Sequence, residues 1–422
     1  MKYKKIEMGA YNIHFIKTNK FKTVEMKINF KREVKKEETS YRSLISEILL
    51  KSSKKYKTGR EMVIADENLY GILYDSGAFN SGRYNIVNFN FTFLSEKYTE
   101  KGMYEKTIEF ISELLLNPNI NKNGFDLEEL SLTKQNLYKM LEAAKETPTY
   151  YIRQKLFENM DENKPVSYND IGYKDIIEKI TKEQLYNYYK EMLKKDIIDI
   201  FIIGDIDEYE LKKIIEKNFN LNTFKKATKS HYITDNKVRF RSQTINEKSD
   251  FKQTYLYMGY NVVKPNMFET HYVSQLYNCI LGASPDSKLF KTVREKHSLC
   301  YSINSSNFLV NNMMLIKTGI NKKNIELATN LIKKEIKNIV LGKFTEEDLT
   351  KAKVIYISSL KKMSDSPQAI LNLYISKEYL NLDLIEDRII NINKVTKKDI
   401  IAYAKKIKLN TSYILEGDEE NE

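Results

Sequence analysis

The chain has 422 residues, 41% of them hydrophobic, which is long enough for two domains and apolar enough for packed cores. Its formal net charge is +12, but acidic residues are interleaved with the basic ones throughout, which disfavours a dedicated nucleic-acid surface. No apolar run of about 18 residues and no signal-peptide core occur, and only two cysteines are present, so we expect a cytoplasmic protein with reduced thiols and no membrane span.

The first half begins with strand-like alternation and continues with helical periodicity. Apolar residues on alternate positions predict strands over 13–18, 24–30 and 86–93, and the 3.6-residue period predicts helices over 41–51, 105–116, 127–142 and 150–160. Thr181 precedes a further helical stretch, where its hydroxyl can accept a free backbone N–H. An apolar strand then ends at Gly204-Asp205.

The second half follows the same order. It opens with a strand over 253–260, continues with helices over 271–281, 325–341, 346–363 and 368–381, and reaches an N-cap at Thr396 before a closing strand that ends at Gly417-Asp418. Matching segments recur at a nearly constant spacing of about half the chain, which indicates an internal duplication. We therefore expect two homologous α+β domains, 1–220 and 244–422, each a mostly antiparallel sheet packed with helices, joined by a basic linker over 221–243.

One segment of the second half carries candidate chemistry. A turn at Gly282-Ala283-Ser284 leads into a short predicted helix over 287–296, and a strand opens near Leu299. This order brings Arg294 and Tyr301 to one end of a sheet. A guanidinium offers a fixed fork of N–H donors and a phenol offers an O–H, so the pair can grip and polarise a peptide carbonyl.

The sequence here resembles the pitrilysin/insulinase superfamily of zinc metallopeptidases. The resemblance runs through a Leu-Gly turn and then through Ser287-Lys288-Leu289-Phe290, Val293-Arg294-Glu295-Lys296 and Leu299-Cys300-Tyr301-Ser302. It implies that Arg294 and Tyr301 hold the substrate backbone and assist at the scissile carbonyl. It also implies a clamshell of two halves around a chamber in which peptides bind partly as an added strand.

The zinc site of that family is missing from this chain. The family carries an inverted His-x-x-Glu-His helix, and its two His and its Glu fall here on Ser43, Glu47 and Ser46, respectively. A serine hydroxyl is neither a good zinc ligand nor a general base. The third-ligand position falls near Lys139 or Met140, with Glu142 as a lone carboxylate close by. The four histidines are scattered singly and are interpreted as packed or surface residues: His14, His231, His271 and His297.

A chain with the Arg/Tyr motif but without the zinc motif can have one of two functions. The resemblance implies the non-zinc, substrate-binding subunit of a heterodimer, as in the mitochondrial processing peptidase, with a homologous zinc-bearing chain as partner and zinc in that partner. The alternative is a peptide-binding or scaffold protein without peptidase function. Retention of both Arg294 and Tyr301 favours the first hypothesis.

Candidate peptide-binding residues lie in both halves. The turn at Gly282, Ala283 and Ser284 stands beside the Arg/Tyr motif in the sequence. In the first half, the strand over 86–93, with Phe89 and Phe91, is a candidate sheet edge for β-augmentation, although an ordinary half-buried strand explains its pattern equally well. Gly77-Ala78-Phe79-Asn80 resembles a turn that lies near the metal in the family.

Overall fold

A computed structural model describes residues 1–219, 232–234 and 237–418, so most of the predicted linker over 221–243 lies outside the described residues. The chain forms two compact units. Unit 1 comprises Met1–Glu142, the described part of Tyr168–His231, and Ser366–Ile375; unit 2 comprises Ala143–Ser167, the described part of Tyr232–Asp365, and Ser376–Glu422. No helix in the described ranges has the length and apolar character needed to cross a membrane.

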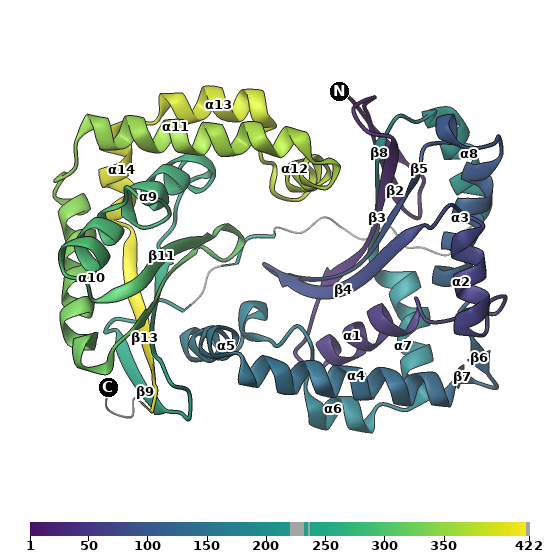
Figure 1. Cartoon of the computed structure of the whole chain (residues 1–422), viewed down its shortest axis with the longest axis horizontal. Coiled ribbons are helices and arrows are strands. Elements are labelled where there is room, and N and C mark those ends of the chain that lie inside the picture. Colours follow the sequence, from purple (N-terminus) through teal and green to yellow (C-terminus); the bar gives the residue numbers. More distant parts are fainter. Residues whose placement is uncertain (220–231, 235–236, 419–422) are drawn as a thin grey trace. The chain divides into compact units, whose positions relative to one another are not determined.

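Unit 1 is built on a six-stranded sheet with helices on one face (Figure 1). Its strand order is β1 (Lys2–Glu7), β2 (Asn12–Lys17), β8 (Ile197–Gly204), β3 (Thr23–Glu33), β5 (Tyr84–Leu94) and β4 (Leu73–Ser81), and only β2 and β8 pair in parallel. The helices are α1 (Glu38–Ile48), α2 (Gly59–Glu67), α3 (Met103–Leu116), α4 (Leu127–Glu146), α6 (Lys174–Lys179), α7 (Lys182–Lys195) and α8 (Glu208–Asn218). Alternate apolar residues of β2, β3, β5 and β8 enter the core that these helices cover.

Unit 2 is built on a five-stranded sheet. Its strand order is β11 (Cys300–Phe308), β12 (Met313–Ile320), β10 (Thr254–Val262), β13 (Ile407–Glu416) and β9 (Gln243–Lys248), and only β13 and β9 pair in parallel. One core lies under α9 (Ser274–Leu281), α10 (Ile325–Val340), α11 (Glu346–Lys362), α13 (Ile385–Lys394) and α14 (Lys397–Ala404). A second core, formed with α5 (Pro148–Met160), covers other residues of the same strands.

The two sheets share one topology, which confirms the prediction of two homologous α+β domains with mostly antiparallel sheets. Apart from the additional edge strand β1, the two sheets follow the same order: β2 or β9 pairs in parallel with the closing strand, β8 or β13, and three antiparallel strands follow across the sheet. Strand β4 of unit 1 therefore corresponds to β11 of unit 2, and both are sheet edges. The predicted N-caps at Thr181 and Thr396 form capping boxes at α7 and α14.

Each unit also includes a helical segment from the other half of the sequence. Helix α5 belongs to the first half, but Leu156 and Met160 pack on the sheet of unit 2. A Cβ atom at Gly259 of β10 would lie only 2.2 Å from the Met160 sulfur, so the glycine permits this close packing. Conversely, the first part of α12 (Pro367–Leu380) packs in unit 1, where Tyr374 stacks on Tyr3 with 4.9 Å between ring centroids.

Candidate active-site half and degenerate metal site

The Arg/Tyr motif is held by an unusual helical turn. The predicted helix takes the form of a π-helix, Phe290–Lys296, which is anchored by the fully buried side chain of Val293. Backbone N–H groups of Ser298 and Leu299 donate to the carbonyls of Arg294 and Val293, both at 3.0 Å. Ser298 adopts a left-handed conformation with φ 51°, which turns the chain directly into β11. π-Helical turns are rare in proteins, and those that do occur are often found at functional sites.

A β-bulge sets the direction of Tyr301. Cys300 pairs with Ile320 and Ser302 pairs with Gly319, so Tyr301 is the extra residue of β11. Bulges release one residue from the strand pairing and re-aim its side chain. The Tyr301 side chain is 84% exposed, which makes its phenol accessible to a ligand.

The structure places Arg294 beside Tyr301. The guanidinium carbon of Arg294 lies 5.4 Å from the centroid of the Tyr301 ring and 4.5 Å from that of Phe290. Stacking on two rings restricts a long side chain that would otherwise lose considerable rotamer entropy on binding. Two hydrogen-bond donors therefore belong to neighbouring side chains. The Arg294 guanidinium is held by its two ring contacts, whereas the Tyr301 phenol is exposed.

The two cysteines are neutral thiols, and Cys300 lies in the motif itself. Cys279 and Cys300 are both free, and burial raises the pKa of Cys279 to about 11. Burial also raises the pKa of Cys300, although the Thr318 hydroxyl and the Arg294 charge act in the opposite direction. Neither thiol is activated as a nucleophile at neutral pH.

The turn at Gly282-Ala283-Ser284 follows α9 and leads towards the π-helix Phe290–Lys296. The N–H groups of Gly282 and Ala283 both donate to the Asn278 carbonyl at 2.9 Å, and the Gly282 carbonyl accepts from the Ser305 N–H at 3.2 Å. A Cβ atom at Gly282 would lie 2.7 Å from the Ser305 hydroxyl oxygen, so glycine is required by this close approach. Gly282 and Ser284 are buried and only Ala283 is exposed. In this structure the turn acts mainly as support for β11.

The strand predicted at the edge of the first sheet is an interior strand, and that prediction is wrong. β3 and β4 pair with the two sides of β5. Phe89 and Phe91 are fully buried in the core, where no surface remains for a peptide. The edge is β4, which carries Gly77-Ala78-Phe79-Asn80, and Phe79 is 42% exposed there.

The residues assigned from the sequence to degenerate zinc positions lie on α1, and the hydroxyl groups of the two serines are engaged by main-chain atoms. Ser43 donates to the Asp170 carbonyl at 2.6 Å, and Ser46 donates to the Ser43 carbonyl at 2.9 Å. Both serines are buried, and Glu47 is half-buried. These residues do not form a zinc ligand set, because the two hydroxyls have partners and only one carboxylate is present.

A segment from 168 to 173 covers this face of α1. The Tyr173 N–H donates to the Ser40 hydroxyl at 3.0 Å, and the Asp170 carboxylate accepts from the Asn80 N–H of β4 at 2.8 Å. Gly172, with φ 101°, lies so close to α1 that a Cβ atom would meet the Ser40 Cα at 2.8 Å. This face of α1 is therefore packed against protein.

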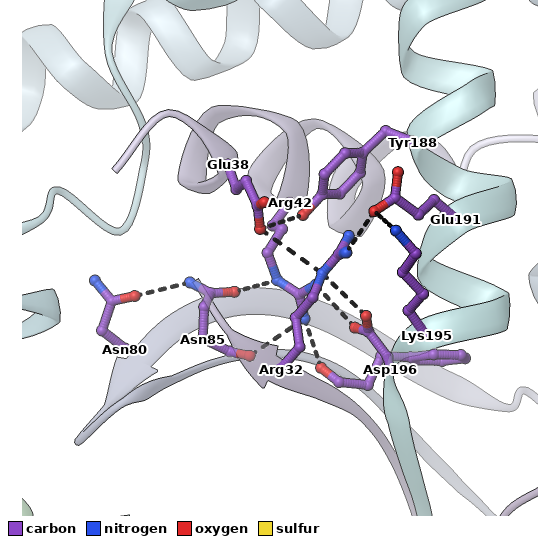
Figure 2. Close-up of polar contacts among 10 residues, drawn as sticks. Arg32, Glu38, Arg42, Asn80, Asn85, Tyr188, Glu191, Lys195 and Asp196 are labelled. Carbon is purple, nitrogen blue, oxygen red and sulfur yellow. Dashed lines mark hydrogen bonds and ion pairs between the residues drawn. The ribbon is translucent and has the colours of Figure 1, made fainter. Parts of the chain in front are cut away.

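A buried ionic cluster of Arg32, Arg42 and Asp196 anchors α1 to the sheet of unit 1 (Figure 2). Arg42, which precedes Ser43, has no exposed surface; it donates to the Asp196 carboxylate at 2.8 Å, to the Asn85 side chain at 2.6 Å and to the Phe30 carbonyl at 2.7 Å. Arg32 contacts the other Asp196 oxygen at 3.1 Å. Desolvation raises the pKa of Asp196, and the two guanidinium groups oppose this effect.

Other expected ligand positions are not gathered into a site. Lys139, Met140 and Glu142 are exposed on α4. His14 is buried between Tyr3 and Asp199, His271 is buried in unit 2, His297 is exposed, and His231 lies outside the described residues. Within the described part of the chain, no three His, Cys, Asp or Glu side chains are close enough together to hold a metal ion.

Sequence reasoning missed the buried charges of unit 1. Asp199 interrupts an otherwise apolar strand, β8, and pairs with Lys31 at 2.6 Å and with His14 at 3.3 Å. Lys31 and His14 together hold the pKa of the Asp199 carboxyl well below its usual range, against the opposing effect of desolvation. A single carboxylate inside such an apolar run was the available signal, because a buried charge requires a partner.

Comparison with known proteins shows what this chain is similar to. Residues 179–356, which include Arg294 and Tyr301, match the model described as "Peptidase M16 inactive domain". The chain is 28% identical over 419 residues to the probable inactive metalloprotease YmfF of Bacillus subtilis, and the similarity covers 98% of both chains. These matches fit a chain that holds no zinc of its own.

Solved structures share the whole fold. A conserved protein from Enterococcus faecalis superimposes with a TM-score of 0.91 at 27% identity, over 100% of both chains. A peptidase M16 inactive domain from Pseudomonas fluorescens superimposes with a TM-score of 0.81 at 16% identity, also over 100% of both chains.

Proposed function

We propose that the chain, which is similar to inactive members of the pitrilysin/insulinase (M16) superfamily, is the substrate-binding subunit of a heterodimeric zinc metallopeptidase. Its partner is a homologous chain that carries the His-x-x-Glu-His helix and the zinc ion. The observation that supports this function most is the asymmetry of the two halves. Arg294 and Tyr301 stand together with the phenol exposed, whereas the α1 face is packed.

In this proposal, Arg294 and Tyr301 act on the peptide backbone. Arg294 binds substrate carbonyls, and the Tyr301 O–H donates to the carbonyl oxygen that gains negative charge during cleavage. Preorganised donors of this kind are worth about 3–4 kcal/mol each in transition-state stabilisation. The chain alone then has no peptidase activity, since the metal-bound water and the general base belong to the partner.

The test is reconstitution. The tagged chain should recover a zinc-bearing homologue from its native organism, and the purified pair should cleave peptides that neither chain cleaves alone. Tyr301→Phe should keep the complex intact and lower turnover. Tyr98→Phe is a matched control, because Tyr98 is 51% exposed and does not belong to the Arg/Tyr motif.

The alternative is a peptide-binding or scaffold protein without a catalytic role. The packed α1 face and the similarity to a probable inactive metalloprotease favour this alternative. It becomes the better conclusion if no zinc-bearing homologue co-purifies, or if Tyr301→Phe leaves cleavage by the pair unchanged.

A further inference from the structure

Thr318 of β12 is a polar residue at a core position. Its neighbours on the same face of the strand, Ile316 and Ile320, are buried in the core under α9 and α10. Thr318 is itself only 3% exposed. A hydroxyl group in such a place costs free energy unless it forms a hydrogen bond, so the partners of this hydroxyl show what it contributes.

The partners of Thr318 are the two residues that flank Tyr301. The Thr318 hydroxyl donates to the Ser302 carbonyl at 2.8 Å, and the Gly319 carbonyl is a more distant acceptor at 3.3 Å. Burial raises the pKa of the Cys300 thiol, and a hydrogen bond with the Thr318 hydroxyl partly opposes this effect. Because a hydroxyl can accept while it donates, the neutral thiol can donate to the same oxygen. Thr318 therefore contacts the chain directly before and directly after Tyr301.

These contacts span the β-bulge of β11. The two flanking residues pair with adjacent residues of β12, which leaves Tyr301 as the extra residue. An extra residue has no partner in the ladder that could fix its direction, so this direction depends on how its neighbours are held. Thr318 holds both neighbours from the buried side of the strand, whereas the Tyr301 side chain is 84% exposed.

We propose that Thr318 is a positioning residue, which fixes the bulge and thereby the direction of Tyr301 beside Arg294. The inference rests on the catalytic role proposed above for Tyr301 and deepens it, because it assigns a buried group to the support of that role. Arg294 has a support of its own, since its guanidinium carbon lies 4.5 Å from the centroid of the Phe290 ring. Substitution of Thr318 should therefore act on turnover and should largely spare the binding that Arg294 contributes.

One test measures the position of Tyr301 in the whole chain without a partner. A fluorinated tyrosine is incorporated in place of Tyr301 only, so that fluorine NMR gives one signal from this ring. Thr318→Val keeps the approximate volume but removes the hydroxyl, and it should shift or broaden the signal. Thr318→Ser keeps the hydroxyl and should give a signal close to that of the parent chain.

Thr411→Val is the matched control for this test. Thr411 is likewise a buried threonine in the sheet of unit 2, and its hydroxyl donates to the Asn410 side chain at 2.8 Å. It lies on β13, which β10 separates from β12. Loss of this hydroxyl removes a comparable buried hydrogen bond away from the bulge, so the fluorine signal should not change.

A second test measures the kinetics of the reconstituted pair. Thr318→Val should lower kcat by about 10- to 100-fold, as expected when a catalytic group is displaced by about 1 Å, and should change KM by less than about threefold. Thr318→Ser should restore most of the turnover. Added to Tyr301→Phe, Thr318→Val should cause no further loss, because the phenolic hydroxyl that it positions is already absent. A general folding defect would lower the turnover of both chains by the same factor.

The possible failures are distinguishable. An unchanged fluorine signal in Thr318→Val, or a loss of turnover that adds in full to that of Tyr301→Phe, overturns the positioning role. A changed signal with unchanged turnover shows that cleavage does not depend on the direction of Tyr301, which also overturns the inference. A changed signal in a chain that forms no active pair overturns the function proposed for Tyr301 but leaves the support of the bulge by Thr318 intact.

Discussion

Replacing Arg42 with methionine should destabilise unit 1 by about 3–5 kcal/mol, the usual cost of removing one partner of a buried ion pair. Arg42 is fully buried and donates to the Asp196 carboxylate, to the Asn85 side chain and to the carbonyls of Phe30 and Asn85. Methionine fills part of the volume but donates nothing. Asp196 then retains Arg32 alone, at 3.1 Å, and two buried carbonyls lose a donor.

The expected loss is large enough to measure by thermal unfolding. For a unit of this size, 1 kcal/mol shifts Tm by about 2–4 °C, so Arg42→Met should lower the transition of unit 1 by about 6–20 °C. Because a chain with two units need not unfold in one step, hydrogen exchange should be followed in peptides from β3 and α1. Arg60→Met is the matched control, since Arg60 is exposed on α2 and should change stability by no more than about 0.5 kcal/mol.

A second substitution tests whether charge is the cause. Adding Asp196→Asn to Arg42→Met removes the carboxylate that the first substitution leaves uncompensated, so the double variant should be more stable than Arg42→Met alone. If Arg42→Met unfolds at the same temperature as the parent chain, or if the double variant loses the sum of both single effects, the account of this cluster is wrong.

Further predictions concern catalysis, metal content and pH. In a reconstituted complex, Tyr301→Phe should lower turnover by about 100-fold or more, and Arg294→Lys should restore little of what Arg294→Ala loses, because lysine lacks the bidentate fork. Elemental analysis of the chain alone should find far less than one zinc per chain, and one tightly bound equivalent on α1 would contradict this reasoning. Burial, the largest effect, lowers the pKa of His271, so the unfolded chain binds this proton more tightly. The Tm of unit 2 should therefore fall as the pH drops below about 6.5, and His271→Gln should reduce this slope.

Much of the fold followed from the sequence because its patterns are local. The 3.6-residue period placed α4, which begins at Leu127 as predicted, and Thr181 and Thr396 cap the helices that follow them. The duplicated order of elements predicted two sheets of one kind, and the strand pairings agree. Adjacency of Arg294 and Tyr301 also followed, because a short helix and a strand separate them by few residues.

The missed features depend on pairing between distant segments. Periodicity gives the faces of a strand but not its neighbours, so β5 could be an edge or an interior strand until its pairing with both β3 and β4 was known. The packing of the 168–173 segment on α1 could not be predicted for the same reason, since Ser43 and Asp170 are far apart in the sequence. The π-helical form of Phe290–Lys296 has no sequence signature of its own.

The equivalence of β4 and β11 shows how the two units of one duplicated fold differ at the same position of the sheet. Both strands are edges, and each lies in the same position of its sheet. In unit 1 the edge N–H of Asn80 is bound by the Asp170 carboxylate, and the same segment fills the α1 face. In unit 2 the corresponding edge begins at the bulge that exposes Tyr301 beside Arg294. In unit 1, the face of α1 is therefore covered by the 168–173 segment, whose main-chain and side-chain contacts stabilise it without a metal. In unit 2, the corresponding strand end leaves Tyr301 exposed beside Arg294. Such a division is the one expected if the metal chemistry belongs to another chain.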